Sequence, residues 1–543
     1  MDREPKNYNY NSLWKKIVDK VTDVQFTPSI YVINPRPCNS EEFVNRDTFS
    51  NKNEDDFRIT STHNKSKPTF SHHDLSSSTR YNASNRFVLN KPRLFNQVLT
   101  AISIALVSLV TGFVSAYTSS ATENIKSDLE VSDKQISWVG GLVPLGALVG
   151  GLIGGQLIDY IGRRLTILIS NALFLLCWIC IALAPSIEYL FIARGITGFS
   201  VGVASLAMPI YLGEVVEPKV RGTLGLFPTA FGNIGILASF LAGTYLSWKN
   251  LAWVGAALSI PFFFLVCIIP ETPRWYLLRS NRIKALDSLQ WLRGSNTDVK
   301  VEFFELVSAQ SEKSDRCCGA TNGLLNNLKP LIIALGLMFF QQLSGITAVI
   351  YYTNDIFQMS ESTIDKNLST VVVGIVNFVS TFVATVLIDR LGRKVLLYVS
   401  SICMILTLSV LGAYFYLVEK HIDTSSYGWV PLVSFIIYVL GFSLGFGPVP
   451  WLMLGEIFTI PVKGVAGSIV TAFHWICTFV VTKTFTDVIE AIGPHGTFWL
   501  YGIMCGISLV FVFILVPETK GKSLQDIEAI IKLRKSNKYV GPA

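Results

Sequence analysis

The 543-residue sequence has little charge for its length, because only 15% of its residues are Asp, Glu, Lys or Arg while 50% are hydrophobic. A soluble protein of this length needs more charge to cover its surface. The charges gather near the two ends of the chain and around residues 270–329. Between them lie apolar runs of about 18 residues or more, which are long enough to cross a bilayer. The composition therefore predicts a polytopic membrane protein.

Other features that are missing exclude further classes of protein. Most of the nine cysteines lie inside apolar runs, and adjacent Cys317 and Cys318 rarely bridge each other, so a disulfide scaffold is not expected. The N-terminal region lacks the apolar core of a signal peptide. The sequence contains no complete Walker-type G-x-x-x-x-G-K-[ST] phosphate loop, catalytic triad or cluster of metal ligands, so we expect no enzyme activity, cofactor or metal. The net charge of +7 belongs to the loops, so we expect no nucleic-acid partner.

Twelve apolar runs are candidates for membrane-spanning helices, six in each half of the chain. The first six are residues 95–117, 138–158, 165–184, 189–212, 226–246 and 251–269. The second six are residues 330–352, 370–388, 395–417, 429–454, 465–486 and 497–516. This pattern predicts an all-α membrane protein with two six-helix bundles, 94–269 and 330–516. We expect a disordered tail over 1–93, a linker with short helices over 270–329 and a C-terminal tail over 517–543.

The loops differ in charge on the two sides of the predicted membrane. One side, here called the basic side, carries most loop lysines and arginines, among them Arg163, Lys219, Arg279 and Arg393. The opposite, acidic side carries mainly Asp and Glu. Because basic loops stay in the cytoplasm, the basic side is expected to be cytoplasmic, and twelve spans place both termini there.

Three charged motifs occur twice, in the same order. "DYIGRR" pairs with "DRLGRK", "PIYLGEVVEPKVRG" with "PWLMLGEIFTIPVKG", and "PETPRWYL" with "PETKGKSL". The acids align with offsets of 389 − 159 = 230, 456 − 214 = 242 and 518 − 271 = 247 residues. Such a repeat indicates two homologous halves, with a substrate site between them near the membrane midplane.

The repeated charges lie at helix ends on the basic side. We expect them to form ion-pair networks that act as a conformational latch on that side, which comprise Asp159, Arg163, Glu214, Arg221, Glu271, Asp389, Arg393, Glu456, Lys463 and Glu518. The alternative is that each charge only orients its helix or caps its end.

These motifs, together with "QQLSGITAVIYYT" and "GPVPW", resemble the sugar porters of the major facilitator superfamily over about residues 94–533. The stretches "RGTLGLFPTAFGNIGILASFLAGTY" and "GWVPLVSFIIYVLGFSLGFGPVPWLMLGEIF" are similar to the branch of that family that transports trehalose in insects. The resemblance implies the major facilitator fold and transport of a sugar, most specifically trehalose, across the plasma membrane.

The resemblance also implies which residues contact the sugar. The family's positions fall on Gln341, Gln342, Thr347, Asn377, Trp451, Trp475, Thr229 and His474. Carboxamides both donate to and accept from hydroxyl groups, and indole rings cover the apolar face of a sugar. Thr347 and His474 replace asparagines that are usual in the family, so the sugar preference remains open. The glutamine pair has an alternative role in joining helices.

Proton-coupled relatives carry a carboxylate in the first span, whereas residues 105–121, "ALVSLVTGFVSAYTSSA", contain no acid. Facilitated diffusion is therefore the favoured mechanism. A hexose facilitator, a proton symporter that uses His474 or Lys483, and a non-transporting sugar sensor with a long N-terminal tail remain alternatives. Asn367 begins a glycosylation sequon on the acidic side. The oligomeric state is not predicted.

Overall fold

The computed structural model describes residues 94–520, apart from 218–219, 221–223, 226, 296, 315–327, 361–363 and 459–462. These residues belong to one unit, Arg86–Ala543. The expected tail 1–93 and the chain from residue 521 onward lie outside the described residues.

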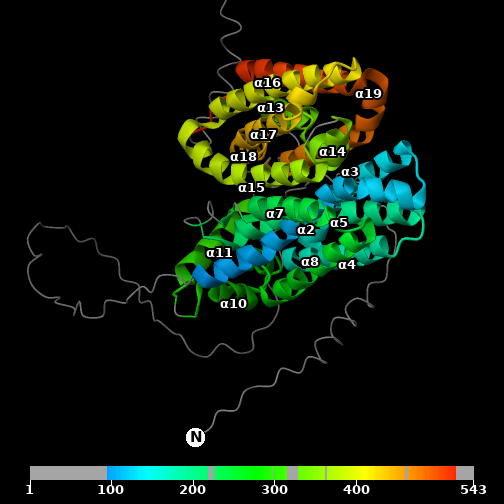
Figure 1. The fold of residues 1–543 in the computed structure, drawn as a ribbon. Helices are drawn as coiled ribbons and strands as arrows, with labels where there is room; N and C mark the ends of the chain where they lie inside the picture. Colours follow the sequence, from blue (N-terminus) through cyan, green and yellow to red (C-terminus); the bar gives the residue numbers. More distant parts are fainter. Residues whose placement is uncertain are drawn as a thin grey trace, which may run out of the picture. The chain divides into compact units, whose positions relative to one another are not determined.

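The first half of this unit contains six long helices, drawn in blue to green in Figure 1. They are α2 (Leu94–Leu129), α3 (Asp133–Ile161), α4 (Arg163–Ala182), α5 (Ile187–Val215), α7 (Phe227–Gly243) and α8 (Trp248–Ile268). In the described part of the polar segment between the halves, three short helices follow: α9 (Pro273–Leu278), α10 (Arg282–Arg293) and α11 (Lys300–Ser314). The predicted amphipathic stretch forms α10, which buries Ala285, Leu289 and Leu292.

The second half contains helices that are broken more often. They are α13 (Leu328–Leu343), α14 (Ile346–Met359), α15 (Lys366–Leu391), α16 (Arg393–Glu419), the 3-10 turn η2 (Ser425–Tyr427), α17 (Val430–Leu444), α18 (Val449–Glu456) and α19 (Lys463–Ile514). Gly345, with φ of 90°, separates α13 from α14. Gly445 ends α17, and Pro448 directly precedes α18, where its missing backbone N–H costs no helical hydrogen bond. These breaks place polar backbone inside two of the predicted spans.

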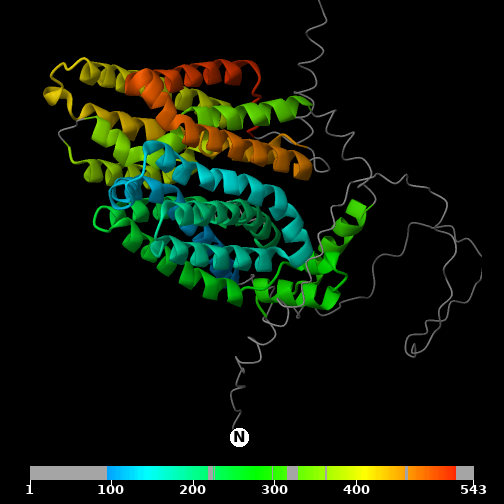
Figure 2. The same ribbon diagram turned by 90° about the vertical axis from the view of Figure 1, so that its right-hand side faces the viewer.

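Ten helical segments of the described chain are long and apolar enough to cross a membrane. The shorter apolar helix α7, of 17 residues, adds one more span. The 52-residue α19 contains two spans, because Gly493 has φ of 75° and breaks the helix. This arrangement confirms the predicted all-α fold of twelve spans in two six-helix bundles, and Figure 2 shows the long helices running side by side.

Close packing between α3 and α5 holds the first half together. A Cβ atom added to Gly146 or Gly150 on α3, or to Gly198 or Gly202 on α5, would lie 2.1 to 2.2 Å from a backbone oxygen of the other helix. Small residues allow such backbone contact in membranes, where dispersion forces and not hydrophobic exclusion drive association.

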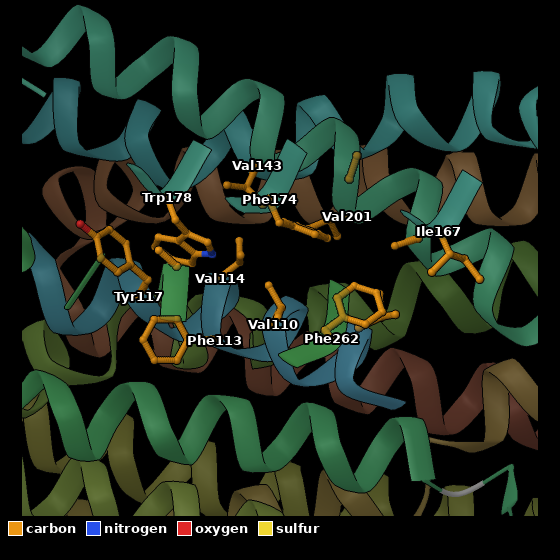
Figure 3. Packing of buried hydrophobic residues seen from close by; sticks show 14 of the residues in the cluster. Val110, Phe113, Val114, Tyr117, Val143, Ile167, Phe174, Trp178, Val201 and Phe262 are labelled. Atoms are coloured by element: carbon orange, nitrogen blue, oxygen red, sulfur yellow. The ribbon is translucent and has the colours of Figure 1, made fainter. Parts of the chain in front are cut away.

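Trp178 fills the centre of the same half. Its ring meets those of Phe113 and Tyr117 edge-on, at 5.4 and 5.2 Å between centroids, and it is fully buried (Figure 3). Aromatic rings prefer this edge-on geometry. These contacts pack α4 against α2.

Candidate functional site

Gln341 and Gln342 lie in the last turn of α13, directly before the break at Gly345, and both side chains are buried. Gln341 Nε2 donates to the carbonyl oxygens of Phe446 and Gly447, at 2.7 and 3.0 Å. Its Oε1 is buried without a hydrogen-bond partner. Gln341 therefore ties α13 to the broken backbone between α17 and α18 and keeps one acceptor available.

Gln342 is held at both ends of its carboxamide. Thr347 Oγ1 donates to Gln342 Oε1 at 2.5 Å, and Gln342 Nε2 lies 3.3 Å from His474 Nδ1. The two residues that depart from the family's usual asparagines are thus both partners of Gln342. If Gln342 Nε2 donates, His474 Nδ1 accepts, so the imidazole is neutral and carries its proton on Nε2.

The two predicted tryptophans flank His474. The His474 ring lies 4.9 Å from the ring of Trp451 on α18 and 5.2 Å from that of Trp475 on α19. Trp451 is 41% exposed, whereas Trp475 Nε1 is buried without a hydrogen-bond partner. The structure thus brings Gln341, Gln342, Thr347, His474, Trp451 and Trp475 together in the second half.

The remaining predicted contacts, Asn377 and Thr229, lie away from this cluster's hydrogen bonds. Asn377 on α15 exchanges hydrogen bonds with Asn233 on α7, and Ser443 Oγ donates to its Oδ1 at 3.5 Å. Thr229, one turn before Asn233 on α7, is exposed. Asn377 therefore belongs to the surface along which α15 meets α7.

On the basic side, an ion pair joins α4 to α5 in the first half. Arg163 Nε lies 3.2 Å from Glu214 Oε2, and Arg163 Nη2 lies 3.5 Å from Asp159 Oδ1. Thr272 Oγ1 donates to Glu214 Oε2 at 2.6 Å. Glu214 therefore links two helix ends to the start of α9.

The second half repeats this arrangement. Arg393 Nη2 lies 3.0 Å from Glu456 Oε1, and Thr519 Oγ1 donates to Glu456 Oε2 at 2.6 Å. Arg221 and the side chains of Asp389 and Lys463 lie outside the described residues. Both ion pairs join helices of the same half.

Glu271 and Glu518 enter these networks through backbone N–H groups at the starts of α4 and α16. Glu271 Oε2 accepts from Arg164 N at 2.9 Å, and Glu518 accepts from Arg393 N and Lys394 N at 3.1 and 2.9 Å. A carboxylate suits a helix N-terminus because the first N–H groups there lack helical partners. These hydrogen bonds match the alternative role considered for the two acids, in which each one caps the end of a helix.

The glycine of each repeated motif makes this capping possible. Gly162 and Gly392 have φ of 102° and 93°, and a Cβ atom would lie 2.5 Å from Glu271 Oε2 and 2.9 Å from Glu518 Oε2. Only glycine adopts that backbone without strain and leaves room for the carboxylate.

The pKa values of the two capping glutamates shift in opposite directions. Burial raises the pKa of Glu271 above its ordinary value, against the opposing hydrogen bonds from Thr272 N and Arg164 N. Burial alone would also raise the pKa of Glu518, but its backbone N–H donors together outweigh burial and lower the pKa.

Sequence reasoning missed Arg194, which is fully buried on α5. Its guanidinium donates to Val139 O at 3.2 Å, to Val114 O at 3.3 Å and to Thr118 Oγ1 at 2.7 Å, and it lies 5.5 Å from the Tyr117 ring. No carboxylate of the described residues forms a salt bridge with it. An arginine inside an apolar run was the available signal, since membrane charges are usually functional.

Several contacts between the halves lie on the acidic side. Lys366 Nζ of α15 lies 2.6 Å from Glu123 Oε2 of α2, and Asn354 N of α14 donates to Ser119 Oγ of α2 at 3.0 Å. Lys483 Nζ of α19 lies 5.3 Å from the centre of the Trp138 ring of α3. Asn367 is in the first turn of α15 near these contacts, and the hydroxyl-bearing Ser369 of its sequon is buried.

The two halves, the broken helices at a polar cluster and the repeated charge networks define a membrane transporter of the major facilitator type. A model of the family "Sugar (and other) transporter" matches residues 92–531. The chain belongs to this family.

Relatives of known name are similar over most of the chain. The "Facilitated trehalose transporter Tret1" of Culex quinquefasciatus is 56% identical over 441 residues, which cover 80% of this chain and 85% of that protein. The protein of the same name from Bombyx mori is 53% identical over 438 residues, covering 80% and 86%. The one from Aedes aegypti is 56% identical over 442 residues, and the matched region spans only 55% of its length.

Solved structures of xylose transporters share the fold. The proton:xylose symporter XylE bound to 6-bromo-6-deoxy-D-glucose is 26% identical, with a TM-score of 0.66 over 80% of this chain and 98% of that chain. The inward-open conformation of XylE from E. coli is 24% identical, with a TM-score of 0.68 over 79% of this chain and 99% of that chain.

Proposed function

We propose that this protein carries trehalose down its gradient across the plasma membrane by alternating access. Membership of the sugar-transporter family and the similarity to proteins named as facilitated trehalose transporters support this assignment. The observation that carries the mechanism is an uncharged polar cluster at the breaks of two membrane helices, which suits an uncharged polyol.

The proposed sugar site uses the cluster around Gln342. The carboxamides of Gln341 and Gln342 and the Nε2–H of His474 supply hydrogen bonds to hydroxyl groups, and half-exposed Trp451 covers an apolar sugar face. Thr347 positions Gln342. Trp475, Asn377 and Thr229 complete the proposed set.

Uniport without protons fits the charges inside the bundle. The first span carries no acid, and the hydrogen bonds that Arg194 donates within the described chain go to neutral groups. An arginine held by carbonyl and hydroxyl oxygens is not expected to release its proton during the proposed cycle, because a guanidinium is a very weak acid. A proton carrier needs a group that titrates in both states.

The basic-side networks are proposed to control opening on that side. They stiffen each half by joining its helix ends, so that the halves move as bodies about the sugar. The proposal includes Asp159, Arg221, Asp389 and Lys463, which the motifs place beside these pairs.

The basic side is proposed to face the cytoplasm, which puts both termini there. The proposed bundles are 94–269 and 330–516, joined by 270–329, with tails over 1–93 and 517–543. Asn367 is the proposed glycosylation site, although burial of Ser369 requires modification before folding is complete.

The experiment is uptake of labelled trehalose, glucose, maltose and sucrose into cells that lack other sugar carriers. Gln342→Ala should reduce trehalose uptake at low concentration by about tenfold or more, since it removes hydrogen bonds at the sugar. Gln358→Ala, at an exposed position of α14, is the matched control. Unchanged uptake by Gln342→Ala would place the site elsewhere.

Two further measurements separate the alternatives. A symporter, unlike a uniporter, would accumulate trehalose in liposomes under an imposed pH gradient alone. A sugar sensor would bind trehalose without moving it, whereas the proposed transporter retains flux after residues 1–93 are deleted. No enzymatic conversion of the sugar is expected in either assay.

A further inference from the structure

Asn233 on α7 forms a reciprocal hydrogen-bonded pair with Asn377 of the opposite half. Asn233 Nδ2 donates to the backbone oxygen of Asn377 at 3.3 Å and to Thr381 Oγ1 at 2.5 Å. Asn377 Nδ2 donates in return to Asn233 Oδ1 at 3.3 Å. The two carboxamides therefore satisfy each other across the boundary between the bundles.

The packing of α7 on α2 fixes the direction of Asn233. A Cβ atom on Gly235 would lie 2.0 Å from the backbone oxygen of Leu109, so this face of α7 rests directly on α2. Asn233, Leu237 and Phe240 follow at spacings of four and three residues, so they share another face. That face meets α15, because a Cβ atom on Gly374 would lie 3.1 Å from both Leu237 and Phe240.

The polarity of the residues along α7 and α15 changes at the position of the Asn233–Asn377 pair. Toward the acidic side, α7 and α15 meet through Leu237, Phe240 and Gly374. Toward the basic side, the next turn of α7 presents Thr229, which is exposed. Asn233 and Asn377 are themselves only partly buried. The pair is therefore reachable from the part of α7 that is not covered by the second half.

We propose that Asn233 is a sugar-binding residue, contributed by the first half to the trehalose site. The inference rests on the proposed function. It adds a carboxamide donor and acceptor on α7, where the only predicted sugar contact is Thr229. A carboxamide presents a donor and an acceptor side by side, as adjacent sugar hydroxyls do. Without sugar, Asn233 and Asn377 bond to each other, so neither is left unsatisfied in the membrane.

Sugar entry exchanges partners without losing hydrogen bonds. A hydroxyl group that takes the place of Asn377 accepts from Asn233 Nδ2 and donates to Asn233 Oδ1, and a second hydroxyl does the same for Asn377. The sugar then forms hydrogen bonds to both halves, so its binding can favour one arrangement of the two halves over another.

The competing role for Asn233 is a structural clamp, in which its carboxamide only joins α7 to α15. Deletion of a clamp shifts the conformational equilibrium and weakens all sugars by the same factor. Deletion of a sugar contact removes the sensitivity to one particular hydroxyl group. Monodeoxy-trehaloses, each lacking one hydroxyl, distinguish the two roles.

The test measures binding of trehalose and of each monodeoxy-trehalose to the purified full-length chain by tryptophan fluorescence. Asn233→Ala is expected to weaken trehalose binding about three- to tenfold, the value of one or two neutral hydrogen bonds. One analogue should bind the natural chain more weakly than trehalose does, and Asn233→Ala should not weaken the binding of that analogue further. Asn233→Ser serves if the alanine variant does not fold.

Two controls keep the outcome specific. Ser239→Ala removes a buried hydroxyl on the same helix, and Thr381→Val removes the other partner of Asn233 while its carboxamide stays. Both should retain the natural pattern across the analogues. If each analogue binds more weakly than trehalose by the same factor in Asn233→Ala as in the natural chain, Asn233 is a clamp and the inference is overturned. If the natural chain binds no trehalose but binds another sugar, the proposed substrate fails, and deoxy derivatives of that sugar test Asn233 in the same way.

Discussion

The ion pair between Arg163 and Glu214 should contribute more to stability than its counterpart in the second half. Arg163 and Glu214 are only 7% and 12% exposed. Glu214→Gln leaves the guanidinium buried opposite a neutral group, and removal of one partner from a buried pair typically costs about 3–5 kcal/mol. Because glutamine still accepts from Thr272, we expect a value near the lower end of this range.

The counterpart variant, Glu456→Gln, acts on a pair that water reaches more easily. Arg393 and Glu456 are 14% and 27% exposed, about twice the values of the first pair. Partial hydration of the remaining arginine reduces the penalty, so we expect a loss of about 1–2 kcal/mol. The two variants carry the same chemical change at equivalent positions, so the comparison isolates burial.

The assay is thermal unfolding of the purified chain, followed by a fluorescent dye that reacts with thiols when buried Cys177 and Cys505 become exposed. Glu214→Gln should lower the unfolding temperature more than Glu456→Gln, and Glu305→Gln, at an exposed position, should leave it unchanged. The double variant Arg163→Met, Glu214→Gln should be less damaging than Glu214→Gln alone, because no buried charge of the pair remains and Asp159, which also loses Arg163, is 75% exposed. Equal losses in the two halves, or a double variant worse than the single one, would refute the reasoning from burial.

Four further predictions concern Gly162, the two capping glutamates and the buried arginine. Gly162→Ala should lower the unfolding temperature and surface expression, because its Cβ atom would meet Glu271 Oε2 at 2.5 Å, whereas Gly195→Ala, with open space around the Cβ position, should be tolerated. Because folding raises the pKa of Glu271, its contribution to stability is fully present below pH 4.5 and is lost as pH rises through the folded-state pKa. Glu271→Gln should therefore stabilise the chain more at pH 7 than at pH 4. Folding lowers the pKa of Glu518, so its contribution to stability is present above pH 4.5 and is lost as pH falls through the folded-state pKa. Glu518→Gln should therefore destabilise the chain at pH 7 and have little effect well below pH 4. Thermal unfolding at each pH measures both effects. Arg194→Leu should abolish correctly folded protein, measured by gel filtration, because two carbonyl groups and a hydroxyl lose their buried donor, and Arg194→Lys should restore part of it.

The sequence was sufficient for the fold because hydropathy alone specifies membrane-spanning segments. Backbone groups in lipid must be satisfied within each helix, so apolar length and helix coincide. The predicted run 165–184 corresponds closely to α4 (Arg163–Ala182). The runs 95–117 and 138–158 were too short, because α2 and α3 continue beyond the apolar region to Leu129 and Ile161.

The partners of individual polar groups were beyond sequence reasoning. Glu271 was expected in an ion pair, and its role as a helix cap depends on the path of the chain after Gly162. The coupling of Thr347 and His474 through Gln342 requires three helices to converge, which no spacing reveals. Asn233 was overlooked because one asparagine in an apolar run is indistinguishable from a helix-packing residue until its neighbour is known.

The positions of the charges suggest how two similar halves divide their tasks. On the basic side, each half has its own ion pair, Arg163–Glu214 or Arg393–Glu456, so the proposed movement of the halves does not require either pair to break. On the acidic side, Lys366 and Glu123 pair across the halves, and that pair must break for the side to open. With 28% and 60% exposure it contributes about 0–1 kcal/mol, so its rupture changes the populations of the two states by no more than about fivefold. A transporter driven only by the sugar gradient needs such small differences between its states, because a strong latch on either side would slow the return of the empty carrier.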